Sequence, residues 1–221
     1  MILAFVGQKG GCGKTTAALA VAAELHARGR KVLLVDADAQ GSCRTWAEVA
    51  AEVGHQAPTV VGMGADLDKP HQLPTLARTY DATVIDCPPR GLAVQTAALR
   101  VADLAVVPCG PSAVDAWALG ETLELVQAAL NTRPELKAAV LITRKVARTA
   151  IGKGAREALA SSGLPILAAE LGYRVAFQEA PAAGLGPAQY APNDPTAQEV
   201  RALTDELVHL AEQTRKGKRH A

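Results

Sequence analysis

The residues best placed for chemistry form one glycine-rich stretch directly behind the apolar run 2–6. In order they are Lys9, Gly10, Gly11, Cys12, Gly13, Lys14, Thr15 and Thr16. The glycines allow a sharp turn that directs backbone N–H groups toward a phosphate chain, Lys14 supplies a positive charge for the β- and γ-phosphates, and the Thr15 hydroxyl is placed to ligate Mg²⁺. The apolar residues 17–22 predict a helix whose positive N-terminal end faces the same phosphates. The stretch therefore predicts a nucleotide phosphate site, in preference to a plain glycine-rich turn.

A second lysine, Lys9, stands at the entrance of this loop. The phosphates bound by the loop itself do not require a lysine there. Two interpretations are open on the residues alone. Lys9 is either a solvated loop charge or a group meant for phosphates held by another subunit.

The spacing Lys-Gly-Gly-x-Gly-Lys-Thr resembles the deviant Walker A box of the ParA/MinD family of dimeric ATPases. In that family the first lysine reaches across a nucleotide sandwich dimer to the ATP of the partner subunit. The resemblance implies ATP and Mg²⁺ as cofactors and an ATP-dependent homodimer. It also implies catalytic roles for Lys9 in trans and for Lys14 in cis.

Carboxylates follow two further apolar runs, with Asp36 and Asp38 after the first and Asp86 after the second. Ligands of an open parallel sheet bind outside the carboxyl ends of its strands, so we expect these side chains to converge on the glycine-rich loop. Asp86 resembles the Walker B aspartate, which would share Mg²⁺ with Thr15 and Asp36. The loop of Asp36 and Asp38 resembles the Asp-x-Asp-Pro-Gln switch I of the family, in which Asp38 orients the attacking water or the metal shell. Ala39 stands where the family has proline, and the alternative is that all three carboxylates are hydrated strand-end caps.

The composition indicates a compact enzyme of the cytoplasm. A chain of 221 residues suits one domain, and its 49% apolar and 3% aromatic residues suit close packing of helices on a sheet. The net charge of +1 means that an anionic partner must be met by a local patch. The four cysteines form no C-x-x-C pair, which argues against structural disulfides or zinc, and no run reaches the roughly 18 apolar residues of a membrane span. The first strand begins at once, so we expect no signal peptide.

Strands and helices alternate along the chain. The expected strands are 2–6, 31–35, 58–62, 82–86, 103–107, 138–143 and 165–169, and the expected helices are 14–28, 43–53, 65–79, 91–101, 113–130, 149–161, 174–182 and 195–213. This alternation predicts an α/β fold of the P-loop NTPase type, with a mostly parallel twisted sheet of about seven strands covered by helices on both faces. We expect one ATPase domain over 1–214, a surface loop over 180–195, a last helix capped by Asp194, and a disordered basic tail over 215–221.

Two later segments extend the resemblance. Residues 108–115 follow the fifth strand as the Pro-x-x-Pro-Ser segment of the family does, and residues 141–144 follow the sixth strand where the family contacts the base. With the short chain, these features resemble the small plasmid-type, ParF-like ParA proteins. The resemblance implies Thr143, Arg144 and Asp115 as candidates for the adenine contact, although each is equally suited to be a helix cap or a surface polar group.

Two basic clusters are candidates for a DNA surface. The first has no intervening acid in the sequence and consists of Arg144, Lys145, Arg148, Lys153 and Arg156. The second is the tail 215–219. A charge run is usually only a solvated face, and it is the resemblance that favours the first cluster. Dimerisation would double either patch, and phosphate contacts add.

Three classes of function compete. The leading hypothesis is a nucleoid-associated DNA-partition ATPase that dimerises on ATP, binds nonspecific DNA and is released when a centromere-binding adaptor of the ParB/ParG type stimulates slow hydrolysis. The first alternative is a MinD-like positioning ATPase for a protein assembly or a membrane surface. Residues 213–221 contain no bulky apolar residue, so we expect no membrane partner. The second alternative, a metallocluster carrier of the same superfamily, would need paired cysteines.

Overall fold

The structure is a computed structural model that describes residues 1–218, with the side chains at positions 150, 152, 153 and 214–218 left out. Its strands are β1 Ile2–Phe5, β2 Val32–Asp36, β3 Thr59–Gly62, β4 Ala82–Asp86, β5 Leu104–Cys109, β6 Lys137–Lys145 and β7 Ile166–Gly172. Its helices are α1 Lys14–Ala27, α2 Ser42–Glu52, α3 Leu73–Leu76, η1 Ala77–Thr79, α4 Leu92–Val101, α5 Ala113–Trp117, α6 Gly120–Thr132, α7 Ala150–Leu159, η2 Ala160–Ser162, α8 Ala176–Ala182, α9 Pro187–Tyr190 and α10 Pro195–Lys218.

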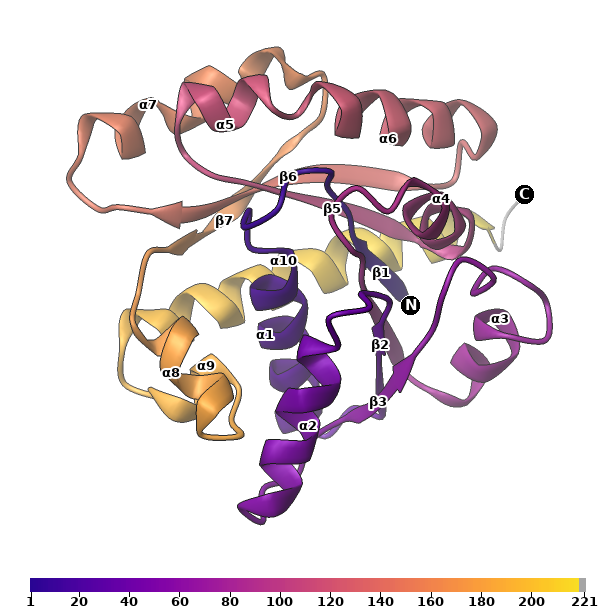
Figure 1. Ribbon diagram of the computed structural model, residues 1–221. Helices are drawn as coiled ribbons and strands as arrows, with labels where there is room; N and C mark the ends of the chain where they lie inside the picture. The colour runs from indigo at the N-terminus through magenta and orange to yellow at the C-terminus, as the bar shows by residue number, and fades with distance from the viewer. Residues whose placement is uncertain (219–221) are drawn as a thin grey trace.

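The seven strands form one parallel sheet in the order β3-β2-β4-β1-β5-β6-β7 (Figure 1). The central strands are buried over nearly their whole length, as expected for a parallel sheet covered on both faces. Strand β1 lies at the centre, between β4 and β5. The order therefore brings the loop after β1 and the ends of β2 and β4 to the same edge of the sheet, and the predicted fold class is confirmed.

The sheet separates two apolar cores. Because side chains alternate along a strand, Leu3 and Phe5 enter one core while Ala4 and Val6 enter the other. Helices α1, α2, α8, α9 and α10 cover the first face, and α3 to α7 cover the second (Figure 1). Helix α1 consists largely of alanine, and its short side chains allow it to pack close beneath the centre of the sheet. This position fixes the N-terminus of α1 behind the glycine-rich loop.

Two predicted helices differ in the structure. The region 65–79 holds only the short helices α3 and η1, because Pro70 and Pro74 interrupt it. The predicted helix 113–130 is divided into α5 and α6 by the turn at Ala118 and Leu119. The division allows α5 to stand apart as a short element directly after β5.

The prediction of a surface loop over 180–195 was wrong for residues 180–190. That part contains the end of α8 and all of α9, and it packs on α2. The indole Nε1 of Trp46 donates to the Leu185 carbonyl at 3.2 Å. Gly184 has φ +67°, and a Cβ there would come within 2.7 Å of the Cα of Ala50. This close approach requires glycine. The segment therefore packs against α2 as part of the core.

Helix α10 begins as predicted, with the Asp194 carboxylate accepting from the Thr196 N–H at 2.7 Å. The helix passes the expected boundary at 214 and continues to Lys218, while residues 219–221 of the predicted basic tail lie outside the described part of the chain. Within the described residues, no helix combines the length and apolar character that crossing a membrane requires.

Candidate nucleotide-binding site

The glycine-rich loop joins β1 to α1 and has the backbone that its sequence predicts. Gly11 has φ +70° and Gly13 has φ +92°, both in the left-handed region that favours glycine. Gly13 is the N-cap of α1, so the first N–H groups of that helix open into the site. Lys14 is buried, and its Nζ donates to the Lys9 carbonyl at 2.9 Å. The loop is thus formed, with its in-cis lysine folded back across it.

Buried polar side chains from other elements hold this loop. Thr143, at the end of β6, donates its hydroxyl to the carbonyls of Cys12 at 2.7 Å and Cys109 at 3.1 Å. A Cβ at Gly13 would contact the same threonine at 3.4 Å. The hydroxyl of Thr143, a predicted adenine contact, is therefore committed to the backbone of the loop.

Gln95 is the second holding side chain. Its side chain is fully buried, its Oε1 accepts from the Gly7 N–H at 3.1 Å, and its Nε2 donates to the Pro88 carbonyl at 2.8 Å. On the neighbouring helix α6, the buried Thr122 hydroxyl accepts from the Gln8 N–H at 3.0 Å. The sequence prediction missed both residues, although a glutamine on the apolar face of a helix was a signal that could have been followed.

The predicted carboxylates converge at the ends of β2 and β4, where Asp36 and Asp86 are direct neighbours in the sheet register. Asp86 is only 1% exposed. Burial raises the pKa of its carboxyl to about 7, and Asp36 acts in the same direction, whereas the Thr15 hydroxyl, Lys14 and Cys43 oppose the shift. A carboxylate held in this environment gains strongly from a cation beside it.

The Asp86 carboxylate fits Mg²⁺. Its Oδ1 is buried without a hydrogen-bond partner among the described residues, and its Oδ2 accepts from the Cys43 thiol at 3.7 Å. Mg²⁺ binds in such sites through one or two carboxylates together with phosphate oxygens and water. Asp86 and the Thr15 hydroxyl are therefore the residues best placed to hold the ion.

Asp36 is held by contacts within its own loop. Its Oδ1 accepts from the Asp38 N–H at 3.3 Å and its Oδ2 from the Arg44 N–H at 3.0 Å, and the Arg44 guanidinium lies 3.6 Å away. These contacts anchor the loop between β2 and α2, so the part of Asp36 in metal binding stays a prediction. Asp38 lies two residues further on, half-buried, with its Oδ1 accepting from the Gln40 N–H at 2.9 Å.

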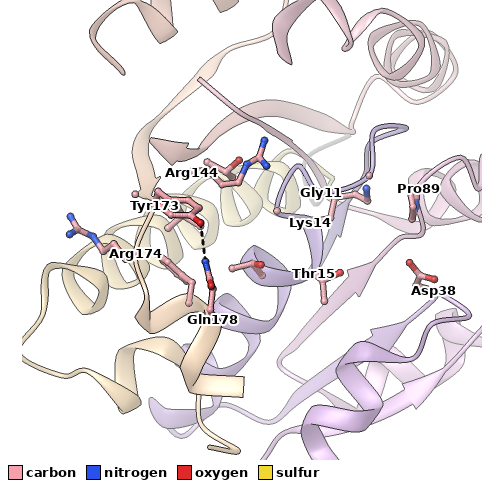
Figure 2. A pocket seen from close by; sticks show the side chains of 16 residues that line it. Gly11, Lys14, Thr15, Asp38, Pro89, Arg144, Tyr173, Arg174 and Gln178 are labelled. Carbon is pink, nitrogen blue, oxygen red and sulfur yellow. Dashed lines mark hydrogen bonds between the residues drawn. The ribbon is translucent and has the colours of Figure 1, made fainter. Parts of the chain in front are cut away.

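A cavity of ≈ 320 Å³ extends from the loop across the carboxyl edge of the sheet. Figure 2 shows Asp38 and Pro89 on one side of it, Arg144 and Tyr173 on the other, and Thr15 between them. It is lined by Gly10, Gly11, Gly13, Lys14, Thr15, Thr16, Asp38, Pro89, Thr143, Arg144, Leu171, Gly172, Tyr173, Arg174, Phe177 and Gln178. The predicted phosphate and switch residues are thus brought into one space.

The segment from Leu171 to Gln178 was not predicted to belong to the site. It supplies Tyr173, which is 62% exposed and accepts from the Gln178 Nε2 at 3.4 Å, and the nearly buried Phe177. A chain with only two Phe, two Trp and three Tyr places two of these aromatics within five residues here. That concentration was the available signal for an apolar wall of a ligand site.

Lys9 lies off the cavity, in an ion pair with Asp115 of α5. The Lys9 Nζ is 2.7 Å from Asp115 Oδ1, and the Arg144 Nη2 is 3.6 Å from the same oxygen. The other oxygen, Oδ2, accepts from the hydroxyl of Ser112 at 2.6 Å in the capping box of α5. Burial raises the pKa of Asp115, but the hydrogen bonds from Lys9 and Ser112 lower it by more. The net pKa therefore lies below the usual range of an aspartate. Asp115 is a cap and an ion-pair partner, and it is not one of the described residues that line the cavity.

The predicted DNA cluster is gathered at β6 and α7, but part of its charge is neutralised. Lys145 forms a close ion pair with Glu170 of β7, and the Arg156 Nε lies 2.9 Å from the same carboxylate. Arg148 is exposed and forms no ion pair within the described part of the chain. The side chain of Lys153 lies outside the described residues. Glu170 is distant in the sequence, so the spacing of the basic residues could not reveal it.

Comparisons with known proteins agree with this site. Residues 3–188 match the family model of the CobQ/CobB/MinD/ParA nucleotide-binding domain. The chain is 32% identical over 210 residues to Maintenance of carboxysome distribution protein A of Halothiobacillus neapolitanus, covering 93% of this chain and 95% of that protein. It is 34% identical over 236 residues to the chromosome-partitioning ATPase Soj of Thermus thermophilus, covering 93% and 94%. The septum site-determining protein MinD of Pyrococcus horikoshii, solved with Mg-ADP, superposes with a TM-score of 0.71 at 20% identity, covering 96% of this chain and 98% of that one.

Proposed function

The chain belongs to the CobQ/CobB/MinD/ParA family of nucleotide-binding proteins and is a P-loop ATPase of its ParA/MinD branch, and from this premise we propose that it is a DNA-partition ATPase. In the proposed cycle, ATP drives homodimerisation and the dimer binds DNA without sequence preference. A centromere-binding adaptor of the ParB/ParG type then stimulates hydrolysis and releases the dimer from DNA. The chromosome-partitioning names of several relatives support this assignment.

The position of Lys9 is the observation that carries the proposal. Lys14 already lies at the phosphate loop, whereas the Lys9 ammonium is directed off the cavity onto Asp115. Its side chain is 38% exposed, so it is accessible to a second molecule. A lysine in this position suits phosphates held by a partner subunit better than those of its own loop.

The hydrolysis step depends on positioning and charge neutralisation, as phosphoryl transfer generally does. The N-terminus of α1 and Lys14 bind the phosphates, and Asp86 and Thr15 hold the Mg²⁺, which neutralises developing negative charge when it is bound. Asp38 faces the cavity from the switch loop, where it can orient a water molecule. No histidine is among the described residues that line the cavity, and the residues that do line it supply charge and positioning, so slow basal turnover is expected.

The DNA surface is proposed on the exposed side of β6 and α7. Because Glu170 neutralises much of Lys145 and Arg156, the charges available to phosphate among the described side chains of the cluster are those of Arg148 and, in part, Arg144. One subunit therefore offers few contacts and binds weakly at physiological salt. A dimer that presents two such clusters on one face makes the second contact effectively intramolecular and raises affinity by avidity.

Two substitutions test the nucleotide-gated dimer. Lys14→Ala should abolish ATP binding, because it removes the in-cis charge at the β- and γ-phosphates. Lys9→Ala should bind ATP as the unsubstituted protein does, but should fail to dimerise or to hydrolyse ATP. Light scattering with ATP and Mg²⁺, together with phosphate release, measures both effects. A Lys9→Ala protein that dimerises and turns over normally would rule out the role of Lys9 in trans.

A positioning ATPase for a protein assembly is the second candidate. The relative named for maintenance of carboxysome distribution, which this chain covers almost completely, favours it. The nucleotide cycle is the same for both candidates, and the cargo differs. The proteins encoded beside this chain separate the two, because a small DNA-binding protein that stimulates the ATPase supports partition. Stimulation only by a component of a protein assembly would support the second candidate instead.

A further inference from the structure

The three non-glycine residues with a positive φ in the described part of the chain are all arginines. They are Arg90 at φ +55°, Arg144 at φ +53° and Arg148 at φ +62°. Glycine and asparagine adopt this conformation at a much lower cost, so the backbone gives no reason for arginine at these positions. Strained residues of this kind are concentrated at functional sites. Arg144 lines the cavity and Arg148 belongs to the proposed DNA surface, whereas neither assignment accounts for Arg90.

Arg90 stands at the apex of a turn whose two ends are fixed. Pro89 and Arg90 are its central residues, and because proline cannot take a positive φ, the signs of φ are those of a type II turn. At one end, the Pro88 carbonyl accepts from Gln95 Nε2 at 2.8 Å. At the other end, a Cβ at Gly91 would lie 2.4 Å from Pro88 Cγ, so the chain closes tightly there. The peptide between Pro89 and Arg90 is therefore the part of the turn that can rotate while the ends stay in place.

The turn lies on the side of the site that holds the carboxylates. Pro89 lines the cavity on the same side as Asp38 (Figure 2), and Asp36 and Asp86 end the neighbouring strands β2 and β4. A terminal phosphate bound beside these groups adds negative charge, which Mg²⁺ offsets only in part. A cation on this side would stabilise ATP more than ADP, since ADP lacks that phosphate.

Arg90 is a cation that this side has available. It is exposed, and none of the ion pairs among the described residues includes it. The neighbouring Arg44 is already engaged, since its guanidinium lies 3.6 Å from Asp36. Arg90 is not among the described residues that line the cavity, although Pro89 is. The arginine must therefore turn inward to reach a phosphate there.

We propose that Arg90 is a specificity-determining residue that binds the terminal phosphate of ATP in its own subunit. Rotation of the Pro89–Arg90 peptide converts the type II turn into type I, in which the second central residue has φ near roughly −90°. The rotation relieves the strain of Arg90 and reverses the direction of its N–H. ATP favours the rotated turn because its terminal phosphate binds the guanidinium, and ADP does not. The inference rests on the proposed function, since it takes ATP to be the ligand that switches the protein.

Arg90→Ala and Arg90→Lys test the charge. Each is combined with Lys9→Ala, so that dimerisation does not contribute to the measured affinity. Titration calorimetry with Mg²⁺ then compares ADP with a non-hydrolysable ATP analogue. Arg90→Ala should lose about tenfold of the preference for the ATP analogue, because a hydrogen bond between charged groups is lost, and should bind ADP as before. Arg90→Lys keeps the charge and should retain most of the preference.

Arg90→Gly separates the strain from the charge. It should lose the same preference as Arg90→Ala, but glycine adopts the positive φ without strain. The nucleotide-free protein should therefore melt about 2 °C higher with glycine, and at an unchanged temperature with alanine. Arg78→Ala is the matched control, because it removes an exposed cation from η1, and it should change neither the preference nor the melting temperature.

Three results would overturn the inference. The first is an unchanged preference in both Arg90→Ala and Arg90→Gly. The second is an equal loss in Arg78→Ala or in Arg90→Lys, because the effect would then not come from a charge at this position. The third is an unchanged melting temperature in Arg90→Gly, which would mean that the turn holds no strain for ATP to relieve.

Failure of the proposed function gives a different result. Lys9→Ala alone would then dimerise with ATP and hydrolyse it normally. In that case the same titrations, made below the protein concentration at which Lys9→Ala dimerises, still decide whether Arg90 distinguishes ATP from ADP.

Discussion

The two sides of the site, on either side of β1, are built differently. On the side of β2 and β4, the charged groups Asp36 and Asp86 are 2% and 1% exposed and sit at the ends of paired strands. On the side of β5, β6 and β7, Lys9 and Arg144 have side chains 38% and 43% exposed, and Tyr173 is 62% exposed. The first side is fixed by sheet register, and the second by ion pairs that another molecule can exchange. The difference indicates that phosphate and metal chemistry belong to the first side and the meeting with other molecules to the second.

The largest expected effect belongs to Asp38, the carboxylate of the first side that lines the cavity. Asp38→Ala should retain ATP binding and the dimer but lose adaptor-stimulated hydrolysis on the order of a hundredfold, because a positioned carboxylate that orients water contributes about that much. Phosphate release in the presence of adaptor and DNA measures it. Asp66→Ala, at an exposed carboxylate in the connection after β3, is the control and should hydrolyse normally. Normal turnover by Asp38→Ala would make Asp38 a plain loop residue and would break the comparison.

The second prediction concerns Asp86 and pH. A folded-state pKa of about 7, above the unfolded value near 4, means that the unfolded state ionises first as pH rises. The nucleotide-free protein should therefore lose stability between roughly pH 4 and pH 7, and the full cost remains at higher pH. Asp86→Asn removes this titration, so it should be more stable than the unsubstituted protein above pH 7 and should lose that advantage below pH 4.

Urea denaturation without nucleotide or Mg²⁺, repeated across this pH range, measures the Asp86 effect. The same variant should lose the extra stabilisation that Mg²⁺ gives to ATP binding, because its buried oxygen is the proposed metal contact. A stability gap that does not depend on pH would show that the carboxyl of Asp86 titrates normally. Burial would then cost the ionised Asp86 less free energy than its 1% exposure indicates.

The third prediction tests how much Thr143, on the second side, stabilises the glycine-rich loop. Thr143→Val keeps the shape of the side chain but removes the hydroxyl that binds the Cys12 carbonyl. It should lower the free energy of unfolding by about 1.5 kcal/mol, because a buried carbonyl loses its partner, and should weaken ATP binding through a looser loop. Thr132→Val is the matched control, since the Thr132 hydroxyl also binds carbonyls but on the exposed surface of α6. Equal losses in both variants would mean that the bond from Thr143 to the loop stabilises the fold no more than a bond on the surface does.

The smallest expected effect concerns DNA. Alanine at both Arg148 and Lys153 should weaken binding of the ATP-bound dimer to all sequences alike by up to about tenfold. The log–log salt slope should fall by about 0.9 for every phosphate that the variant no longer neutralises. Alanine at Lys69 and Arg78, two exposed cations near the other edge of the sheet, removes the same charge and should leave binding intact. If the control pair weakens binding equally, the DNA surface is not confined to the second side.

The sequence was most informative where the chemistry is local. The glycine-rich loop and the apolar runs before Asp36 and Asp86 predicted the parallel sheet and the convergence of the carboxylates, because strand-end residues share one edge in such a fold. It was least informative where distant segments meet. The spacing could not reveal which segments Gln95 joins beneath the loop, nor that Glu170 lies beside Lys145 and Arg156. The wall at 171–178 was missed for the same reason, since β7 reaches the site only through the strand order.

The Gln95 side chain has a mechanical consequence. It joins the end of β1 at Gly7 to the loop after β4 at Pro88, and both bonds are made by one amide on α4. The two segments on either side of the proposed phosphate site are therefore both held by α4. A shift of either segment when nucleotide is exchanged must rotate the amide or break one of its bonds, so α4 receives the motion directly. The exposed Leu92, at the first turn of this helix, is the place where such a displacement would reach the surface.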